Sequence, residues 1–177
     1  MASDINPNYI HYLRNLTTAK PYLEVARVDV ERGDDFTALR GRFDTVICLN
    51  VLEHVGDPLQ ALRNMRSALA PGGKLVLYVP HGQSLYSSLD EVLGDRAMLE
   101  RELAAAGFEL AEWRFFNRAA VPGWWWNGRI LRRRSFSRVQ LKLFDLAVPI
   151  LRRVDRLLPW RGLGLIAIAR RVEPPVA

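Results

Sequence analysis

The sequence predicts an α/β fold, a Rossmann-like three-layer sandwich with a mostly parallel sheet. Short apolar segments rich in β-branched residues alternate with amphipathic segments long enough to be helices, which is typical of βαβ units. Two of the apolar segments, 43–49 and 75–79, have the composition of strands that are buried on both faces. A polar cluster from Asn50 to His54 follows the first of them directly. Open α/β sheets bind their ligands at such carboxyl ends of strands.

The first half of the chain carries clear helix signals between the expected strands. Asn6 followed by Pro7 is a good helix start, and Asp57 followed by Pro58 supplies an N-cap and a proline at the first helical position. The run Pro71-Gly72-Gly73 is expected to end the second of these helices. The elements expected in this half are a helix from residue 6, a strand at 23–30, a short helix at 34–39, the strand at 43–49, a helix from 58 and the strand at 75–79.

The second half contains a long segment of different character. A helix at 96–106, closed by Gly107, leads to an aromatic strand at 108–116. A turn is expected at 121–123, and a long amphipathic helix from about Ser137 to Leu158, which Pro149 is expected to kink or divide. A last strand is expected at 163–169. Residues 117–161 therefore form an insertion between the last two strands of one domain that covers residues 1–177.

The positive charge of the chain is concentrated in that insertion. The net charge is +6, but residues 129–161 contain ten Lys or Arg and two Asp, so this segment carries +8 and the remainder −2. The single cysteine, Cys48, lies in a predicted strand and is expected to be buried and inert in a reducing compartment. The sequence shows no signal peptide and no apolar run long enough for a membrane span, so we expect a cytoplasmic protein.

Three stretches carry a resemblance to a known family. FDTVICLNVLEHV, DPLQALRNMRSALAPGGKLVLYVP and LAAAGFEL resemble the latter part of a class I S-adenosylmethionine-dependent methyltransferase with a type 11/12-like domain. The resemblance implies S-adenosyl-L-methionine as cofactor and methyl transfer to a small-molecule or glycan acceptor, with O-methylation as the expected reaction. The tail, with VPGWWWNGRIL and RVDRLLPW, is similar to methyltransferase domains fused behind glycosyltransferases, which implies association with a glycosyltransferase.

The resemblance assigns cofactor contacts to two acids. In the family, an acid that ends the second strand accepts hydrogen bonds from both ribose hydroxyls; Asp4, followed by Ile5, matches this position. An acid that ends the third strand holds the adenine amino group; Asp29, followed by Val30, matches it. The alternative is that Asp4 only leads into a helix cap and Asp29 only solvates a strand end.

The polar cluster after the strand at 43–49 supplies the remaining candidates in the first half. Asn50 would line the methyl-transfer pocket, and His54 is the candidate base for a hydroxyl acceptor. Glu53 and His81, which follows the next strand, are candidates for contacts with the substrate. The alternative is that Asn50 makes a helix-start hydrogen bond and that Glu53 and His54 orient the loop and cap backbone groups.

One departure from the family concerns the glycine-rich loop that follows its first strand. Class I methyltransferases use a GxGxG loop there, whereas the first glycine of this chain is Gly33. We therefore expect an N-terminally truncated version of a longer protein, lacking a strand in the middle of the sheet, that binds S-adenosylmethionine poorly on its own. A non-catalytic remnant, or a binding or scaffold domain with a basic cap that faces a membrane or a glycan, is the alternative function.

The insertion pairs tryptophans with arginines and suggests its own partners. Trp124 and Trp125 are candidates for contact with a sugar substrate. The amphipathic stretch 124–158 has two interpretations: burial in the core or an interface, and contact with the surface of a membrane. Nucleic acid ranks below both because no RNA or DNA motif surrounds the basic run. The sequence contains no pattern of metal ligands.

Overall fold

The computed structural model describes residues 1–80, 96–125 and 138–173. Its strands are β1 (Ala2–Asp4), β2 (Val25–Arg27), β3 (Phe43–Leu49), β4 (Leu69–Pro80), β5 (Phe108–Phe116) and β6 (Gly164–Arg171). Its helices are α1 (Pro7–Thr17), α2 (Pro58–Ala68), α4 (Arg96–Ala105), α5 (Val121–Trp125) and α6 (Arg138–Val154), with 3₁₀ turns η1 (Gly33–Leu39), η2 (Leu52–His54) and η4 (Asp155–Leu157).

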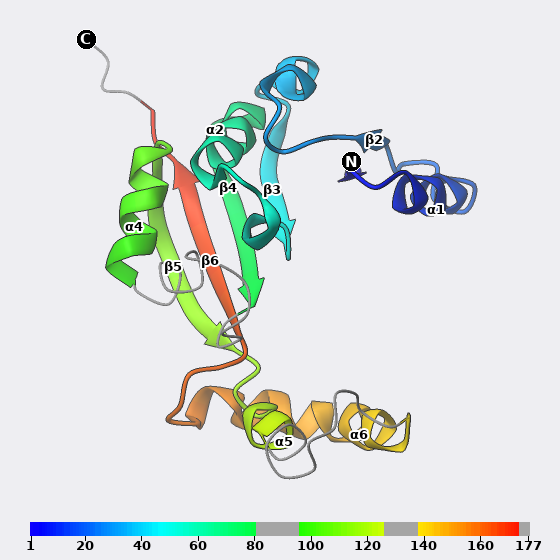
Figure 1. Cartoon of the computed structure of the whole chain (residues 1–177), viewed down its shortest axis with the longest axis vertical. Coiled ribbons are helices and arrows are strands. Elements are labelled where there is room, and N and C mark those ends of the chain that lie inside the picture. Colours follow the sequence, from blue (N-terminus) through cyan, green and yellow to red (C-terminus); the bar gives the residue numbers. More distant parts are fainter. Residues whose placement is uncertain (81–95, 126–137, 174–177) are drawn as a thin grey trace.

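The strands form two separate sheets within these described ranges. One holds β1 and β2 as a parallel pair, and the other has the order β3-β4-β6-β5. In the larger sheet β3 is parallel to β4, and β6 is antiparallel to both of its neighbours, so β3, β4 and β5 run in the same direction (Figure 1). The predicted α/β class with mostly parallel strands is therefore confirmed.

The core lies between the larger sheet and helices α2 and α4. Leu62 and Met65 of α2 and Leu103 of α4 are almost fully buried, together with Leu75 and Leu77 of β4. Burying each of these side chains contributes about 1.5–3 kcal/mol relative to leaving it in water. Apolar residues at a helical spacing in α2 thus meet apolar residues at a strand spacing in β4, as the sequence pattern requires.

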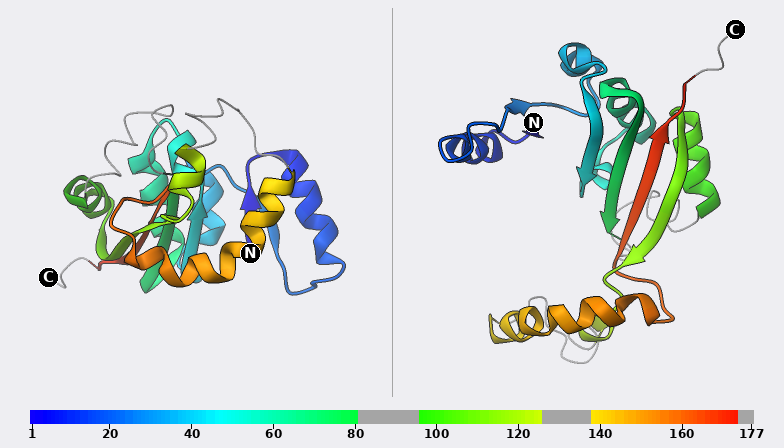
Figure 2. Two further views of the ribbon diagram at one scale, coloured as in Figure 1. Left: turned by 90° about the horizontal axis from the view of Figure 1, so that it is seen from below. Right: turned by 180° about the vertical axis from the view of Figure 1, so that it is seen from behind.

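Strand β3 has the predicted bounds but not the predicted burial. Cys48 is 6% exposed, whereas its neighbours Ile47 and Leu49 are 64% and 55% exposed. The expectation of a strand buried on both faces is therefore wrong. The reason is that β3 is the edge strand of its sheet, and its alternate residues point to a face that the described helices α2 and α4 do not cover (Figures 1 and 2).

Three expectations about turns and breaks are also corrected. The expected turn at 121–123 is the beginning of α5, because a proline near the first turn of a helix loses no internal hydrogen bond. Pro149 lies inside α6 and does not divide it. Helix α2 ends at Ala68, before the run Pro71–Gly73, because Leu69 already has an extended backbone. Gly72, with φ of 69°, instead lies at the irregular start of β4.

Helix α1 packs on the small sheet and forms an N-terminal unit with it, residues 1–30. Asn6 caps α1 as predicted, and its side chain accepts a hydrogen bond from the backbone of Asn8 at 2.9 Å. Ile10 and Val28 are its buried apolar residues among those described. Figure 1 shows this unit to one side of β3, and both views of Figure 2 agree.

Candidate functional site

The two acids that the sequence singles out lie at the same end of the β1–β2 pair. Asp4 is the last residue of β1 and pairs with Arg27, the last residue of β2. The backbone N–H of Val28 donates to the carbonyl of Asp4 at 3.2 Å, so Asp29 follows one residue further on. The parallel pairing therefore brings both carboxylates to one edge, as the nucleoside site requires.

Each of these carboxylates also makes a local turn. Asp4 accepts a hydrogen bond from the backbone of Asn6 at 2.7 Å, and Asp29 accepts one from Glu31 at 3.1 Å, in both cases through Oδ1. A carboxylate has a second oxygen and about four acceptor sites in all, so a turn does not use its capacity. Both interpretations of these acids thus remain compatible with the structure, because capping and ligand binding can use different oxygens.

The loop after β3 has a strained start. Asn50 has φ of 51°, a left-handed conformation that a non-glycine residue adopts at a cost of about 1–3 kcal/mol. Its backbone N–H donates to the carbonyl of Tyr78 at 3.0 Å, so the loop is fixed to the end of β4. Within the 3₁₀ turn that follows, Glu53 is buried and His54 is exposed. Asn50, Glu53 and His54 therefore lie on one short, well-anchored loop.

Glu53 dominates the electrostatics of this loop. Burial, with the charge of Glu53 as the second cause, raises the pKa of the Cys48 thiol to about 12. Burial also raises the pKa of Tyr78, and the charge of Glu53 acts in the same direction. One buried carboxylate thus acts on a residue of β3 and a residue of β4, and Cys48 stays a neutral thiol, as predicted for an inert cysteine.

A hydrogen bond links the acid-bearing edge to this loop. Glu31, two residues beyond Asp29, accepts a hydrogen bond from the backbone of Asp57 at 2.8 Å, and Asp57 caps the helix that follows the loop. Val30 takes part as well, because its carbonyl accepts a hydrogen bond from the side chain of Asn64 at 2.8 Å. The structure therefore connects the segment after β2 to the start of α2.

The structure does not bring all the predicted residues together. The β1–β2 pair is not hydrogen-bonded to β3, and Figure 1 shows Asp4's strand well to the side of the tip of β3. Ile5 is exposed, as is Trp125 on α5. His81 lies outside the described residues, and for Trp124 only the backbone, in α5, is described. No group of three or more His, Cys, Asp or Glu in the described ranges could hold a metal ion.

Tyr78 is a further candidate residue of this site, and the sequence pattern did not single it out. It lies across from Leu49 in the β3–β4 register, and its ring meets Phe116 edge-on with 6.2 Å between centroids. Its ring also fills the space beside Gly164, where a Cβ atom would come within 2.5 Å of it. Period-two counting along the strand would have placed Tyr78 on the uncovered face beside Asn50.

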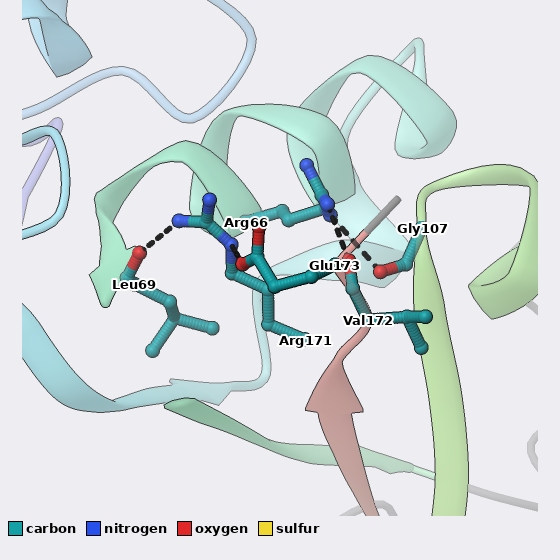
Figure 3. A network of polar contacts seen from close by, with 6 residues as sticks. All are labelled: Arg66, Leu69, Gly107, Arg171, Val172 and Glu173. Carbon is teal, nitrogen blue, oxygen red and sulfur yellow. Dashed lines mark hydrogen bonds and ion pairs between the residues drawn. The ribbon is translucent and has the colours of Figure 1, made fainter. Parts of the chain in front are cut away.

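Arg66 is a second residue that the sequence did not point to, and its role is structural. Its guanidinium donates to the carbonyls of Gly107 and Val172, and Arg171 nearby bonds the carbonyl of Leu69 and pairs with Glu173 at 2.9 Å (Figure 3). This network ties the end of α2 to the turn before β5 and to the end of β6. It lies at the amino ends of β4 and β5, away from the candidate site.

Comparisons with known proteins assign a class to this arrangement. The structure superposes on a trans-methyltransferase, CalH, solved in complex with SAH, with a TM-score of 0.61 at 18% identity, over 96% of this chain and 42% of that one. At that identity the likeness concerns the fold alone. Residues 1–75, less than half of the chain, match the family described as "Methyltransferase domain".

Curated relatives agree with that family. The ubiquinone biosynthesis O-methyltransferase of Vibrio parahaemolyticus is 31% identical over 97 residues, which are 48% of this chain and 41% of that protein. The human thiol S-methyltransferase TMT1B is 30% identical over 110 residues, which are 56% of this chain and 45% of that protein. The chain thus spans less than half the length of each of these two relatives.

Proposed function

We propose that this chain takes part in S-adenosylmethionine-dependent methylation of a hydroxyl of a small-molecule or glycan acceptor. The observation that carries the proposal is the pair of acids, Asp4 and Asp29, at one edge of a segment that matches a methyltransferase domain family. The ubiquinone biosynthesis O-methyltransferase among the relatives supports oxygen as the acceptor atom. The human relative named a thiol S-methyltransferase makes sulfur the competing choice.

Each candidate residue would have a separate role in cofactor binding or methyl transfer. Asp4 would accept hydrogen bonds from the ribose hydroxyls and Asp29 from the adenine amino group, each through oxygen capacity beyond its local turn. The cofactor supplies an electrophilic methyl group on a sulfonium when bound. Asn50 would position the reacting groups, and the exposed His54 would accept the proton of the hydroxyl. Positioning carries most of the rate, so His54 contributes less than the acids.

Residues 1–177 alone should bind the cofactor weakly. The acids and the Asn50 loop belong to two sheets with no strand pairing between them, so no single sheet edge holds both groups of contacts. The sequence also contains no GxGxG loop through which backbone amides could approach the methionine moiety. The expected truncation and the expected association with a glycosyltransferase remain predictions.

An NMR titration with S-adenosylhomocysteine tests the proposal. At about millimolar ligand, amide shifts should concentrate at Asp4, Asp29 and Asn50, and the Asp4→Ala/Asp29→Ala variant should lose them. The matched control is Asp44→Ala, which removes an exposed acid from β3 and should leave the shifts unchanged. Shifts elsewhere, or none at all, would contradict the nucleoside site. Micromolar binding in isothermal titration would contradict the expected weakness while leaving the site intact.

A binding or scaffold domain is the second candidate. The observation that favours it is the same division into two sheets, which leaves the acids of one apart from the loop of the other. Folds of this kind host many functions, so the fold alone does not decide between them. A chain that shows no shift with S-adenosylhomocysteine, and no methyl transfer to any hydroxyl or thiol acceptor, would support this candidate.

A further inference from the structure

Helix α6 and the turn η4 that follows it carry a stripe of exposed apolar side chains. Its members are spaced three or four residues apart, so they share one face of the helix. They are 37–80% exposed, although large apolar side chains are usually buried. The α6 stripe consists of Leu143, Leu146, Ile150, Val154 and Leu157.

A second apolar row of α6, beside the stripe, is less exposed. Ala147, Val148 and Leu151 are half-buried, so the second apolar row of the helix is partly covered while the α6 stripe is not. None of the described residues of α6 belongs to the core cluster, and the two interpretations of the stretch 124–158 stay predictions. What remains is an amphipathic helix with an apolar face turned outward.

Hydrogen bonds fix the direction in which the stripe points. The guanidinium of Arg118 donates to the carbonyl of Leu158 at 2.7 Å, and the backbone of Ala119 donates to Asp155 at 2.8 Å. The indole N–H of Trp160 donates back to the carbonyl of Arg118 at 2.7 Å. These bonds hold η4 and the residues just after it against the segment that precedes α5, so the C-terminal end of the stripe is anchored to the rest of the chain.

Basic side chains border this surface. Lys142 is one helical turn before Leu146 in the stripe, and Arg153 is one turn after Ile150; both are exposed. From residue 142 to 157 the sequence has four basic residues (Lys142, Arg152, Arg153, Arg156) and two acids (Asp145, Asp155), a net charge of +2. One of these acids, Asp155, is engaged with the backbone of Ala119.

We propose that the α6 stripe lies in the headgroup region of an anionic lipid surface. An apolar face inserts among the acyl chains while lysine and arginine at its border meet the lipid phosphates, and the two effects add. No helix in the described ranges is long and apolar enough to cross a membrane, so α6 would lie along the surface. The arrow ends of β4 and β5 point toward α5 and α6, so this surface is on the side of the sheet's carboxyl edge (Figure 1).

A second copy of this chain suits the α6 stripe less well. In a twofold antiparallel pairing of α6, Lys142 of one copy would approach Arg152 and Arg153 of the other, and like charges at an interface are repulsive. A nucleic acid would use the basic border but would leave the apolar stripe in water. An anionic lipid surface is the partner whose chemistry uses both features.

Co-sedimentation of the 177-residue chain with lipid vesicles tests the proposal. The vesicles are phosphatidylcholine alone or with phosphatidylglycerol at a ratio of about 7:3. We expect binding to the anionic vesicles to be at least about tenfold stronger, and to weaken in about 0.5 M salt. Leu146→Ser/Ile150→Ser should reduce binding to the anionic vesicles by about tenfold or more, because two apolar side chains no longer insert among the acyl chains. Lys142→Ala/Arg153→Ala should reduce it by a similar factor.

The control variant is Tyr22→Ser. Tyr22 is 80% exposed, like the members of the stripe, but lies between α1 and β2, so its loss should not change vesicle binding. Circular dichroism of each variant establishes that it is folded. The proposal is overturned if neither vesicle binds the chain, or if Tyr22→Ser reduces binding as much as the stripe variant. A concentration-dependent dimer that Leu146→Ser/Ile150→Ser abolishes would overturn it in favour of a second copy.

Discussion

At the scale of single residues, Glu53 shows how much one buried side chain decides. Burial is the larger cause of the raised pKa of both Cys48 and Tyr78, and the charge of Glu53 adds to it in both, although these residues belong to different strands. A buried carboxylate next to a polar loop is a common feature of functional sites, but it also occurs in purely structural networks. The sequence indicated a role for Glu53 through its place after β3; its burial could not be predicted, because it depends on how η2 packs.

The first prediction concerns the pH dependence contributed by Cys48. The folded chain holds this pKa at about 12, against an ordinary value of 9.0. Above pH 9 the unfolded chain loses the proton and the folded chain keeps it, so the free energy of unfolding falls by about 1.4 kcal/mol per pH unit. Below pH 9 both states keep the proton and the effect vanishes. Urea unfolding of wild type and Cys48→Ala at pH 7 and pH 10 measures the difference, and equal pH slopes would contradict it.

The second prediction concerns Gly107. Its φ is 80°, and an added Cβ atom would lie 2.5 Å from Nε of Arg66. Gly107→Ala should therefore lower the free energy of unfolding by about 2–4 kcal/mol, from backbone strain together with a displaced guanidinium. Gly72→Ala is the matched control, because Gly72 has φ of 69° but open space around it. It should cost only about 1 kcal/mol. Equal losses from the two substitutions would show that the contact with Arg66 has no effect.

At the scale of elements, local signals predicted what local forces determine. Strand β3 begins and ends at the predicted residues, and caps at Asn6 and Asp57 start α1 and α2 as expected, because each depends on near neighbours in the chain. The exposure of Ile47 and Leu49 could not be predicted, because it depends on which helices cover the far side of the sheet. The strand at 23–30 shortens to β2 for a related reason, since it pairs only with the three residues of β1.

The third prediction concerns the link between α2 and the far end of the sheet. Arg66→Met keeps most of the side-chain length but leaves the carbonyls of Gly107 and Val172 without their guanidinium donor. The free energy of unfolding should fall by about 1–3 kcal/mol, the cost of partly buried carbonyls that lose a charged donor. Arg63→Met, on the exposed side of the same helix, should change it by less than about 0.5 kcal/mol. A similar loss in both variants would point to the helix itself and not to the network.

At the scale of the whole molecule, the division into two sheets is the central feature. Within the N-terminal unit, Ile10 lies outside the main core cluster, whereas Val28 belongs to it and Ala26 and Val30 pack against it. Between the two, Glu31 and Val30 make hydrogen bonds to α2, and Arg42 pairs with Glu24 at 3.1 Å on the surface. An exposed ion pair contributes about 0–1 kcal/mol, so the two hydrogen bonds and the packing of Val28 in the core join the units more strongly than this pair does.

The last prediction follows from this division and also tests the proposed site. In hydrogen exchange, peptides from β1 and β2 should exchange faster than those from β4 and β6, because a small, partly exposed unit opens at a lower free energy than the core. S-adenosylhomocysteine at about millimolar concentration should then slow exchange both at residues 4–30 and at residues 43–56, since the nucleoside acids lie on one unit and the Asn50 loop on the other. Slower exchange in only one segment would mean that the two units do not share a ligand. The Asp29→Ala variant tests whether slower exchange in both segments comes from one bound nucleoside. If it does, the substitution should abolish the slowing in both segments.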